Sequence, residues 1–250
     1  MSASSSKSSR FSRRLLLGSS LASAAIVPLG SHHTTFVEPA RAGRAARARR
    51  QEATPSPVGW RTWYLSSSDE LRPKAPGAPS QAEIDEVVAA QSAASDEMAA
   101  AITRWGSGPA VIAWSQLAEE VSAEFNIGGM AHGRFLAIYH TALHDAAIAA
   151  WDAQVALARP SPGATSEKIT PAAGVDPQRP SFPSEHAAVA GAAATTLAYL
   201  VPDAEAGRFD ALAAEAAESR IAAGAAFRSD IDAGLALGQA IGEKAVARAK

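Results

Sequence analysis

The sequence predicts an all-α protein whose main domain is a single helical bundle behind an N-terminal export signal. Hydrophobic residues make up 47% of the 250 residues, but much of that fraction is alanine, and aromatic residues make up only 6%. Alanine has the highest intrinsic helix propensity, so this composition favours helices over strands. Helix-capping patterns and apolar residues at helical spacing indicate the same fold class.

Residues 1–42 have the features of a twin-arginine export signal. Arg13 and Arg14 precede a modest apolar run that ends near Leu29, and a small-residue cleavage pattern follows at 40–42. Glycine, serine and proline interrupt the run, so it is a poor permanent membrane anchor; an uncleaved anchor or a basic tail is the alternative. No later segment reaches the roughly 20 apolar residues that a span needs. We therefore expect an exported protein with no permanent membrane span.

The remaining chain divides at a proline-rich segment. Residues 43–79 are expected to form a flexible arm and linker, because they are rich first in arginine and then in proline and serine. Aromatic side chains in the stretch 59–64 can pin the arm to the domain. Residues 80–250 are expected to form the helical domain.

The helices of this domain follow from capping patterns and apolar spacing. Ser80 and Glu83 form a capping box, which opens a first helix with an apolar stripe extending to Ile102. Further helices are expected after Pro109, from about Ala131 to Ala156, from Ser184 to near Pro202, after a cap at Asp203, and from a second capping box at Ser229 and Asp232.

Two further features of the domain stand out. The proline-rich stretch 159–183 is too long for a simple connection, and loops of this length are often functional. Three glycines lie four residues apart on one face of the last expected helix and allow close approach of a neighbouring helix: Gly234, Gly238 and Gly242.

Several function classes are excluded by composition and motifs. The formal net charge of −2 argues against a nucleic-acid partner, and the absence of cysteine excludes disulfide and thiolate chemistry. The sequence contains no phosphate-binding Walker loop, dinucleotide fingerprint or Gly-x-Ser-x-Gly elbow. The triplet 106–108, Gly-Ser-Gly, is interpreted as a turn.

An oxyanion pocket is indicated at the start of the helix expected from Ser184. The unpaired N–H groups of a first helical turn attract anions, and the helix dipole adds to this attraction. His186 lies in that turn, where it can transfer a proton to or from a bound ligand. Arg220 can neutralise a tetrahedral oxyanion through a bidentate contact. The alternative is that His186 is a satisfied first-turn histidine and Arg220 a surface ion pair.

Three parts of the chain carry the motifs of one family, in the family's order. They are Asp145-Ala146 with the stretch 150–153, the stretch Phe-Pro-Ser-Glu-His-Ala at 182–187, and Ser219-Arg220 with Gly224, Asp230 and Gly234. These parts resemble the helix before the first motif, the second motif (Pro-Ser-Gly-His) and the third motif (Ser-Arg-x3-Gly-x-His, then Asp and Gly) of a known superfamily. That superfamily unites vanadium-dependent haloperoxidases with type-2 phosphatidic-acid phosphatases, and this chain resembles a degenerate member.

The resemblance implies an all-α bundle that holds phosphate or vanadate in a core pocket. In the family, the second-motif histidine is a general acid, and the third-motif histidine is the nucleophile or the vanadium ligand. By this resemblance His186 is the catalytic residue, and Ser184 and Arg220 bind the oxyanion. A phosphate-like small molecule is the expected ligand, and vanadate is a possible cofactor.

Departures from the family pattern make the catalytic set incomplete. The third-motif histidine falls on Ala226, whose methyl group can neither attack phosphorus nor bind vanadium. The first-motif lysine falls on Gln154, which keeps hydrogen-bonding capacity but loses the charge. The family arginine falls on Ser161, and Arg159 is the candidate substitute as an oxyanion ligand. Glu185 replaces a glycine, and its carboxylate would repel phosphate unless it faces solvent.

Two functions follow from this mixed pattern. The first is an oxyanion-pocket enzyme, a phosphoester hydrolase or a vanadate-dependent halide oxidiser, with His186 as its catalytic residue. The second is a catalytically inactive relative with a phosphate-binding or structural role, which Ala226 favours. His140 and His144 have the i, i+4 spacing of zinc ligands, but Thr141 stands where the metalloprotease pattern needs glutamate, so we expect polar packing and no metal site.

Overall fold

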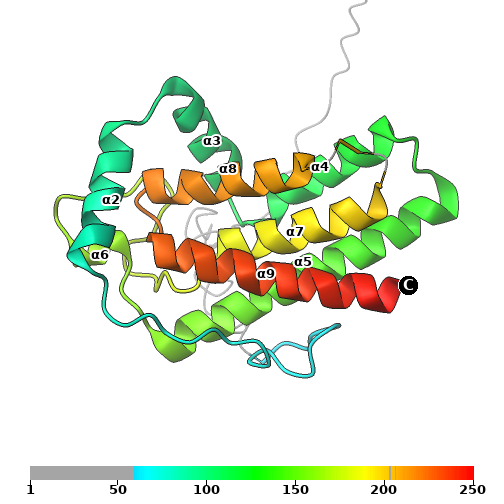
Figure 1. The fold of residues 1–250 in the computed structure, drawn as a ribbon, viewed down its shortest axis with the longest axis horizontal. Helices are drawn as coiled ribbons and strands as arrows, with labels where there is room; N and C mark the ends of the chain where they lie inside the picture. The colour runs from blue at the N-terminus through cyan, green and yellow to red at the C-terminus, as the bar shows by residue number, and fades with distance from the viewer. Residues whose placement is uncertain (1–58, 203, 206) are drawn as a thin grey trace, which may run out of the picture. The chain divides into compact units, whose positions relative to one another are not determined.

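The fold of the computed structural model, which describes residues 59–202, 204, 205 and 207–250, is all-α as predicted (Figure 1). No β-strand occurs among these residues. The helices are α2 (Gln81–Ser92), α3 (Asp96–Gly106), α4 (Val111–Glu124), α5 (Gly129–Leu157), α6 (Pro162–Thr165), α7 (Glu185–Leu200), α8 (Arg208–Ala222) and α9 (Arg228–Ala249). The expected export signal and the first part of the arm, residues 1–58, lie outside the described residues.

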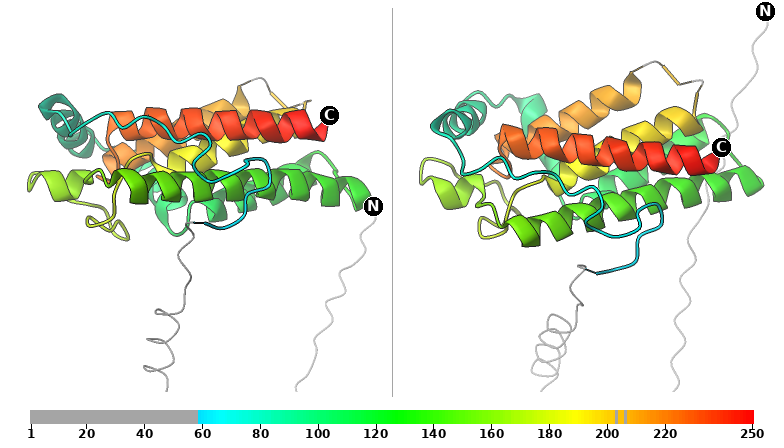
Figure 2. Two further views of the ribbon diagram at one scale, coloured as in Figure 1. Left: turned by 90° about the horizontal axis from the view of Figure 1, so that it is seen from below. Right: turned by 60° about the horizontal axis from the view of Figure 1, so that its bottom comes forward.

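The alanine-rich helix α7 is the centre of the bundle. It packs against α5, α8 and α9, which flank it in Figures 1 and 2. Because most of its side chains are small, its neighbours approach its backbone closely, and larger buried side chains such as Trp114, Tyr139 and Leu197 fill the surrounding core. Within the described residues, no helix combines the length and apolar character needed to cross a bilayer.

The glycine face of α9 lies against α7, as its spacing predicted. A Cβ atom at Gly234 would lie 2.5 Å from the carbonyl oxygen of Ser184, and one at Gly238 would overlap the carbonyl oxygen of Ala188. On the opposite helix, a Cβ at Gly191 would lie 2.5 Å from the carbonyl oxygen of Leu235. The two helices therefore meet backbone to backbone, which fixes the position of the N-terminus of α7.

Replacing Gly238 with alanine should destabilise the protein by about 1–3 kcal/mol, because the added methyl group has no space against α7. Gly133 is the matched control: it is also helical, in α5, but a Cβ there would meet no atom within 4 Å. Gly133→Ala should stabilise the protein by up to about 1 kcal/mol through helix propensity. Urea unfolding measures both effects, and equal shifts of the two variants would contradict the close contact.

The first expected helix is two helices in the structure. The capping box at Ser80 is present: the Glu83 backbone N–H donates to the Ser80 hydroxyl (3.2 Å), and the Glu83 carboxylate accepts from the Ser80 backbone N–H (3.0 Å). However, α2 ends at Ser92, and α3 has its own cap, because the Ser95 hydroxyl accepts from the Met98 N–H (3.3 Å). The apolar stripe extending to Ile102 therefore spans a break.

The start of α9 also differs from the expectation. The Ser229 hydroxyl does not cap the helix but donates to the Glu83 carboxylate. The capping contact comes instead from Asp230, whose carboxylate accepts from the Phe227 backbone N–H (2.8 Å). The expected cap at Asp203 lies outside the described residues.

The arm over residues 59–79 contacts α5 and α9, and Lys244 of α9 pairs with Glu70 of the arm (2.6 Å). The buried carboxylate of Asp145 accepts from the backbone N–H groups of Trp63 (2.9 Å) and Tyr64 (2.7 Å), and Arg72 pairs with Asp152. Residues 43–58 of the expected arm lie outside the described residues.

The two histidines at helical spacing pack against aromatic groups. The ring of His144 stacks on Trp60, with 6.4 Å between centroids, and its Nε2 lies 3.0 Å from the Arg61 carbonyl oxygen. His140 lies edge-on to Tyr139 at 5.3 Å. Both rings therefore take part in the packing around α5.

Candidate functional site

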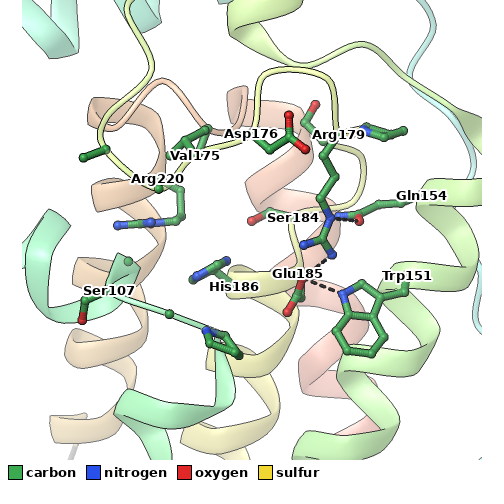
Figure 3. A pocket seen from close by; sticks show the side chains of 18 residues that line it. Ser107, Trp151, Gln154, Val175, Asp176, Arg179, Ser184, Glu185, His186 and Arg220 are labelled. Atoms are coloured by element: carbon green, nitrogen blue, oxygen red, sulfur yellow. Dashed lines mark hydrogen bonds and ion pairs between the residues drawn. The ribbon is translucent and has the colours of Figure 1, made fainter. Parts of the chain in front are cut away.

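A cavity of about 590 Å³ lies at the N-terminal end of α7 (Figure 3). Its wall combines the turn after α3, the end of α5, the long loop before α7, the first turn of α7 and the C-terminal half of α8. The polar side chains on this wall are Ser107, Gln154, Asp176, Arg179, Ser181, Ser184, Glu185, His186 and Arg220. Four of the five predicted site residues are therefore brought together: Ser184, His186, Arg220 and Gln154.

The first turn of α7 presents its free amides toward this region. Ser184 is the N-cap, as predicted, and its hydroxyl accepts from the Ala187 N–H (3.3 Å). Its own N–H donates to the Asp230 carbonyl oxygen of α9 (2.9 Å), which ties the cap to the neighbouring helix. The amides of Glu185 and His186 have no intrahelical acceptor in a first turn, and the helix dipole makes this end attractive to anions.

The imidazole of His186 has a nitrogen atom that remains available for proton transfer. Its Nε2 atom is buried and has no hydrogen-bond partner among the described residues. Burial and, to a smaller extent, the nearby charge of Arg220 lower the pKa of His186 to about 4. The ring is therefore neutral at pH 7. This geometry does not support the alternative that His186 is a first-turn histidine with its hydrogen bonds satisfied.

Arg220 is a buried cation without a carboxylate partner among the described residues. Its side chain is buried, with hydrogen bonds from Nε to the Ser219 hydroxyl (3.1 Å) and from Nη2 to the Ile102 carbonyl oxygen (3.0 Å). Burial lowers the pKa of Arg220 to about 10, and no neighbouring carboxylate offsets this effect. A buried unpaired charge is costly, so this geometry favours a bound anion over the surface ion pair considered above.

The turn after α3 contacts the guanidinium of Arg220. A Cβ atom at Gly106 would lie 2.7 Å from Nη2 of Arg220, so the guanidinium packs directly on the glycine. Gly108 lines the same cavity as His186. The triplet that the sequence indicated as a simple turn therefore lines the site, and its first glycine packs against Arg220.

Glu185 points into the cavity wall and not into solvent. Its Oε2 atom accepts from Trp151 Nε1 (2.6 Å) and pairs with the guanidinium of Arg179. Arg179 also donates through Nε to Gln154 Oε1 (3.3 Å), and Gln154 donates through Nε2 to the Pro183 carbonyl oxygen (2.9 Å). The charge of Glu185 is thus partly neutralised within the site.

Arg159 is the predicted site residue that the structure does not bring to the cavity. Its buried guanidinium pairs with the carboxylates of Glu83 (3.0 Å) and Asp230, and it donates to the Ser229 hydroxyl (2.9 Å) and the Gly77 carbonyl oxygen (3.1 Å). These contacts use its donors, so it cannot be the expected oxyanion ligand. Arg159 instead joins α2 to the start of α9.

The cation that lines the cavity in its place is Arg179. The sequence offered one signal for it: an arginine followed by proline, directly before the second motif, within a loop already judged too long for a plain connection. Ala226 is not among the residues that line the cavity, although Ala225 is; with 2% of its surface exposed, it is buried in an apolar cluster with Phe227 and Ile231. The third motif therefore supplies Arg220 but no nucleophile.

Stability should fall as the pH is lowered from about 6.5 to about 4, in part because of His186. An unfolded histidine takes up its proton near pH 6.5, whereas the folded side chain resists until its pKa of about 4, so protons favour the unfolded chain in this window. His186→Gln should remove that part of the slope, worth a few kcal/mol. Urea unfolding between pH 7 and pH 4 measures it, and identical slopes in both proteins would contradict the prediction.

Comparisons with known proteins agree with this geometry. Residues 135–245 match a family model described as the PAP2 superfamily. The fold is similar to that of the first bacterial vanadium-dependent iodoperoxidase, with a TM-score of 0.64 and 20% identity over 80% of this chain and 63% of that one. It is also similar to a holo-type bacterial vanadium-dependent chloroperoxidase, with a TM-score of 0.58 and 14% identity over 76% of this chain and 53% of that one.

This chain thus spans less than two thirds of either protein of known structure. A search of curated proteins found no match. At these identities the structural similarity establishes the fold alone.

Proposed function

We propose that the cavity at the start of α7 binds a tetrahedral oxyanion of the phosphate type. The motifs of the chain resemble those of the PAP2 superfamily, and residues 135–245 match the model of that superfamily. The observation that carries this proposal is Arg220, a buried guanidinium on the cavity wall with no carboxylate partner among the described residues. The first-turn amides of α7 and the Ser184 cap supply hydrogen-bonding groups beside it.

The residues present fit an oxyanion held by charge and hydrogen bonds, whether phosphate or vanadate. They do not fit vanadium bound through the third motif, because the side chain of Ala226 has no ligand atom. Halide oxidation, which the names of the two structurally similar proteins imply for them, is therefore not favoured by this site.

The function that the geometry supports best is oxyanion binding without rapid turnover. Removing a catalytic nucleophile typically lowers the rate by several orders of magnitude, even where binding groups remain. The binding groups remain here, whereas position 226 cannot attack phosphorus.

Slow phosphoester hydrolysis is the second candidate, favoured by the free Nε2 of His186. A neutral imidazole can take a proton from a water molecule while the water oxygen bonds to phosphorus and the ester P–O bond breaks. The imidazolium then returns a proton to the leaving oxygen, which departs as the alcohol. Hydrolysis of p-nitrophenyl phosphate above the buffer background, lost in His186→Gln, would establish this activity.

Calorimetric titration of orthophosphate and of orthovanadate into the full-length chain tests the main proposal. We expect each anion to bind at one site and to compete with the other. A flat titration with both anions would refute oxyanion binding and leave a structural role for the retained fold.

We further propose that the protein is exported, on the basis of the twin-arginine pattern in residues 1–42. Mass spectrometry of the protein recovered outside the cytoplasm should find an N-terminus close to residue 43. Recovery of the whole protein in the cytoplasm with Met1 or Ser2 at its N-terminus would contradict export.

A further inference from the structure

One end of the cavity already holds a cation, the guanidinium of Arg179 (Figure 3). It pairs with the carboxylate of Glu185, donates to Gln154 Oε1 (3.3 Å), and lies 6.0 Å from the centroid of the Trp151 ring. A buried carboxylate, an amide oxygen and an aromatic face are the groups that bind organic cations in proteins. This end of the cavity is therefore a cation subsite.

Glu185 in this subsite can accept further hydrogen bonds. Its side chain is 7% exposed, and only its Oε2 atom accepts hydrogen bonds from the described residues. The anion-binding end, formed by Arg220 and His186, lies in the same cavity. The cavity thus places an acidic end and a basic end within reach of one small molecule.

Arg179 is suited to be displaced from the subsite. Its side chain is 48% exposed and comes from the long loop before α7, so it can move into water with little loss of packing. Arg159, by contrast, has a side chain that is 3% exposed and pairs with two carboxylates. A ligand cation that replaced Arg179 would keep the buried carboxylate of Glu185 paired, which avoids the cost of isolating it.

We propose that the ligand is zwitterionic: a phosphate ester that carries a primary ammonium group on a short chain. Its phosphate lies at Arg220 and the α7 N-terminus, and its ammonium takes the place of Arg179 at Glu185 and Trp151. This inference rests on the oxyanion site proposed above and names its ligand class. A phosphate without an ammonium group would leave Arg179 in place at Glu185 and gain no contact with this carboxylate.

The test compares two ligands that differ only in the ammonium group, 2-aminoethyl phosphate and ethyl phosphate. Calorimetry measures the affinity of both ligands for the full-length chain, for the Arg179→Ala variant and for the double variant Arg179→Ala with Glu185→Gln. We expect Arg179→Ala to bind 2-aminoethyl phosphate about tenfold more tightly than ethyl phosphate. The preference should be smaller in the parent protein, where Arg179 competes, and should vanish when Glu185→Gln removes the charge. Thermal unfolding of each variant verifies that it is folded.

Two results would overturn the ligand class while leaving the oxyanion site intact. Equal affinity of Arg179→Ala for the two esters would remove the ammonium subsite. A tenfold or greater loss of ethyl phosphate binding in Arg179→Ala would show that Arg179 is an anion ligand, not a cation that occupies the place of the ligand's ammonium. Failure of orthophosphate and both esters to bind the parent protein would overturn the oxyanion site itself, and the ligand class with it.

Discussion

Arg220→Ala is expected to weaken orthophosphate binding by roughly a hundredfold, or about 3 kcal/mol. In the proposed site, the guanidinium would contact the anion in a buried setting, where a charged hydrogen bond is strong. Arg220→Lys should recover part of the affinity, because it restores the charge but not the planar fork of donors. Calorimetric titration of orthophosphate measures each variant.

The control for this experiment lies on the same helix. Arg208 begins α8 and forms a surface ion pair with Glu124 (2.7 Å), so Arg208→Ala removes the same side chain far from the cavity lining. It should leave orthophosphate affinity unchanged. The unfolding free energy separates a binding role from a structural one: Arg220→Ala should lose affinity with little loss of stability, because its own buried charge is unpaired. Unchanged affinity in Arg220→Ala would refute the site.

Arg159→Met is expected to destabilise the protein by about 3–5 kcal/mol at pH 7, because it leaves the fully buried carboxylate of Asp230 without its cation. Burial raises the pKa of Asp230 even with Arg159 in place, and loss of Arg159 would raise it further. Protonation of Asp230 relieves the unpaired charge, so the difference between variant and parent should shrink as the pH is lowered. Urea unfolding at neutral and acidic pH measures this dependence.

Arg228 provides the comparison for this prediction, because it is adjacent to the same helix start but lies at the surface. It pairs with Glu218 and Glu86, and all three side chains are more than one third exposed. Arg228→Met should therefore cost less than about 1 kcal/mol. Addition of Asp230→Asn to Arg159→Met should recover part of the lost stability. A loss of anion affinity in Arg159→Met without any loss of stability would instead restore Arg159 as an oxyanion ligand.

The sequence by itself determined the features of this protein that depend on local chemistry. The Ser184 cap, the capping box at Ser80 and the glycine face of α9 each follow from a few residues whose spacing matches the period of one helix. The motifs around His186 and Arg220 likewise indicated the superfamily whose model matches residues 135–245. These signals are local, so no knowledge of the path of the chain was needed to interpret them.

Only the tertiary structure decided which side chains meet in the cavity. Arg159 and Arg179 are both loop arginines followed by proline, yet one is buried against Asp230 and the other lines the cavity. The carboxylate of Glu185 pairs with Arg179 and does not face solvent. The guanidinium of Arg220 packs directly on Gly106. The physical reason is that an arginine or glutamate side chain is long and flexible. Its partner is set by the route of the loop and the approach of the neighbouring helices, which local spacing does not contain.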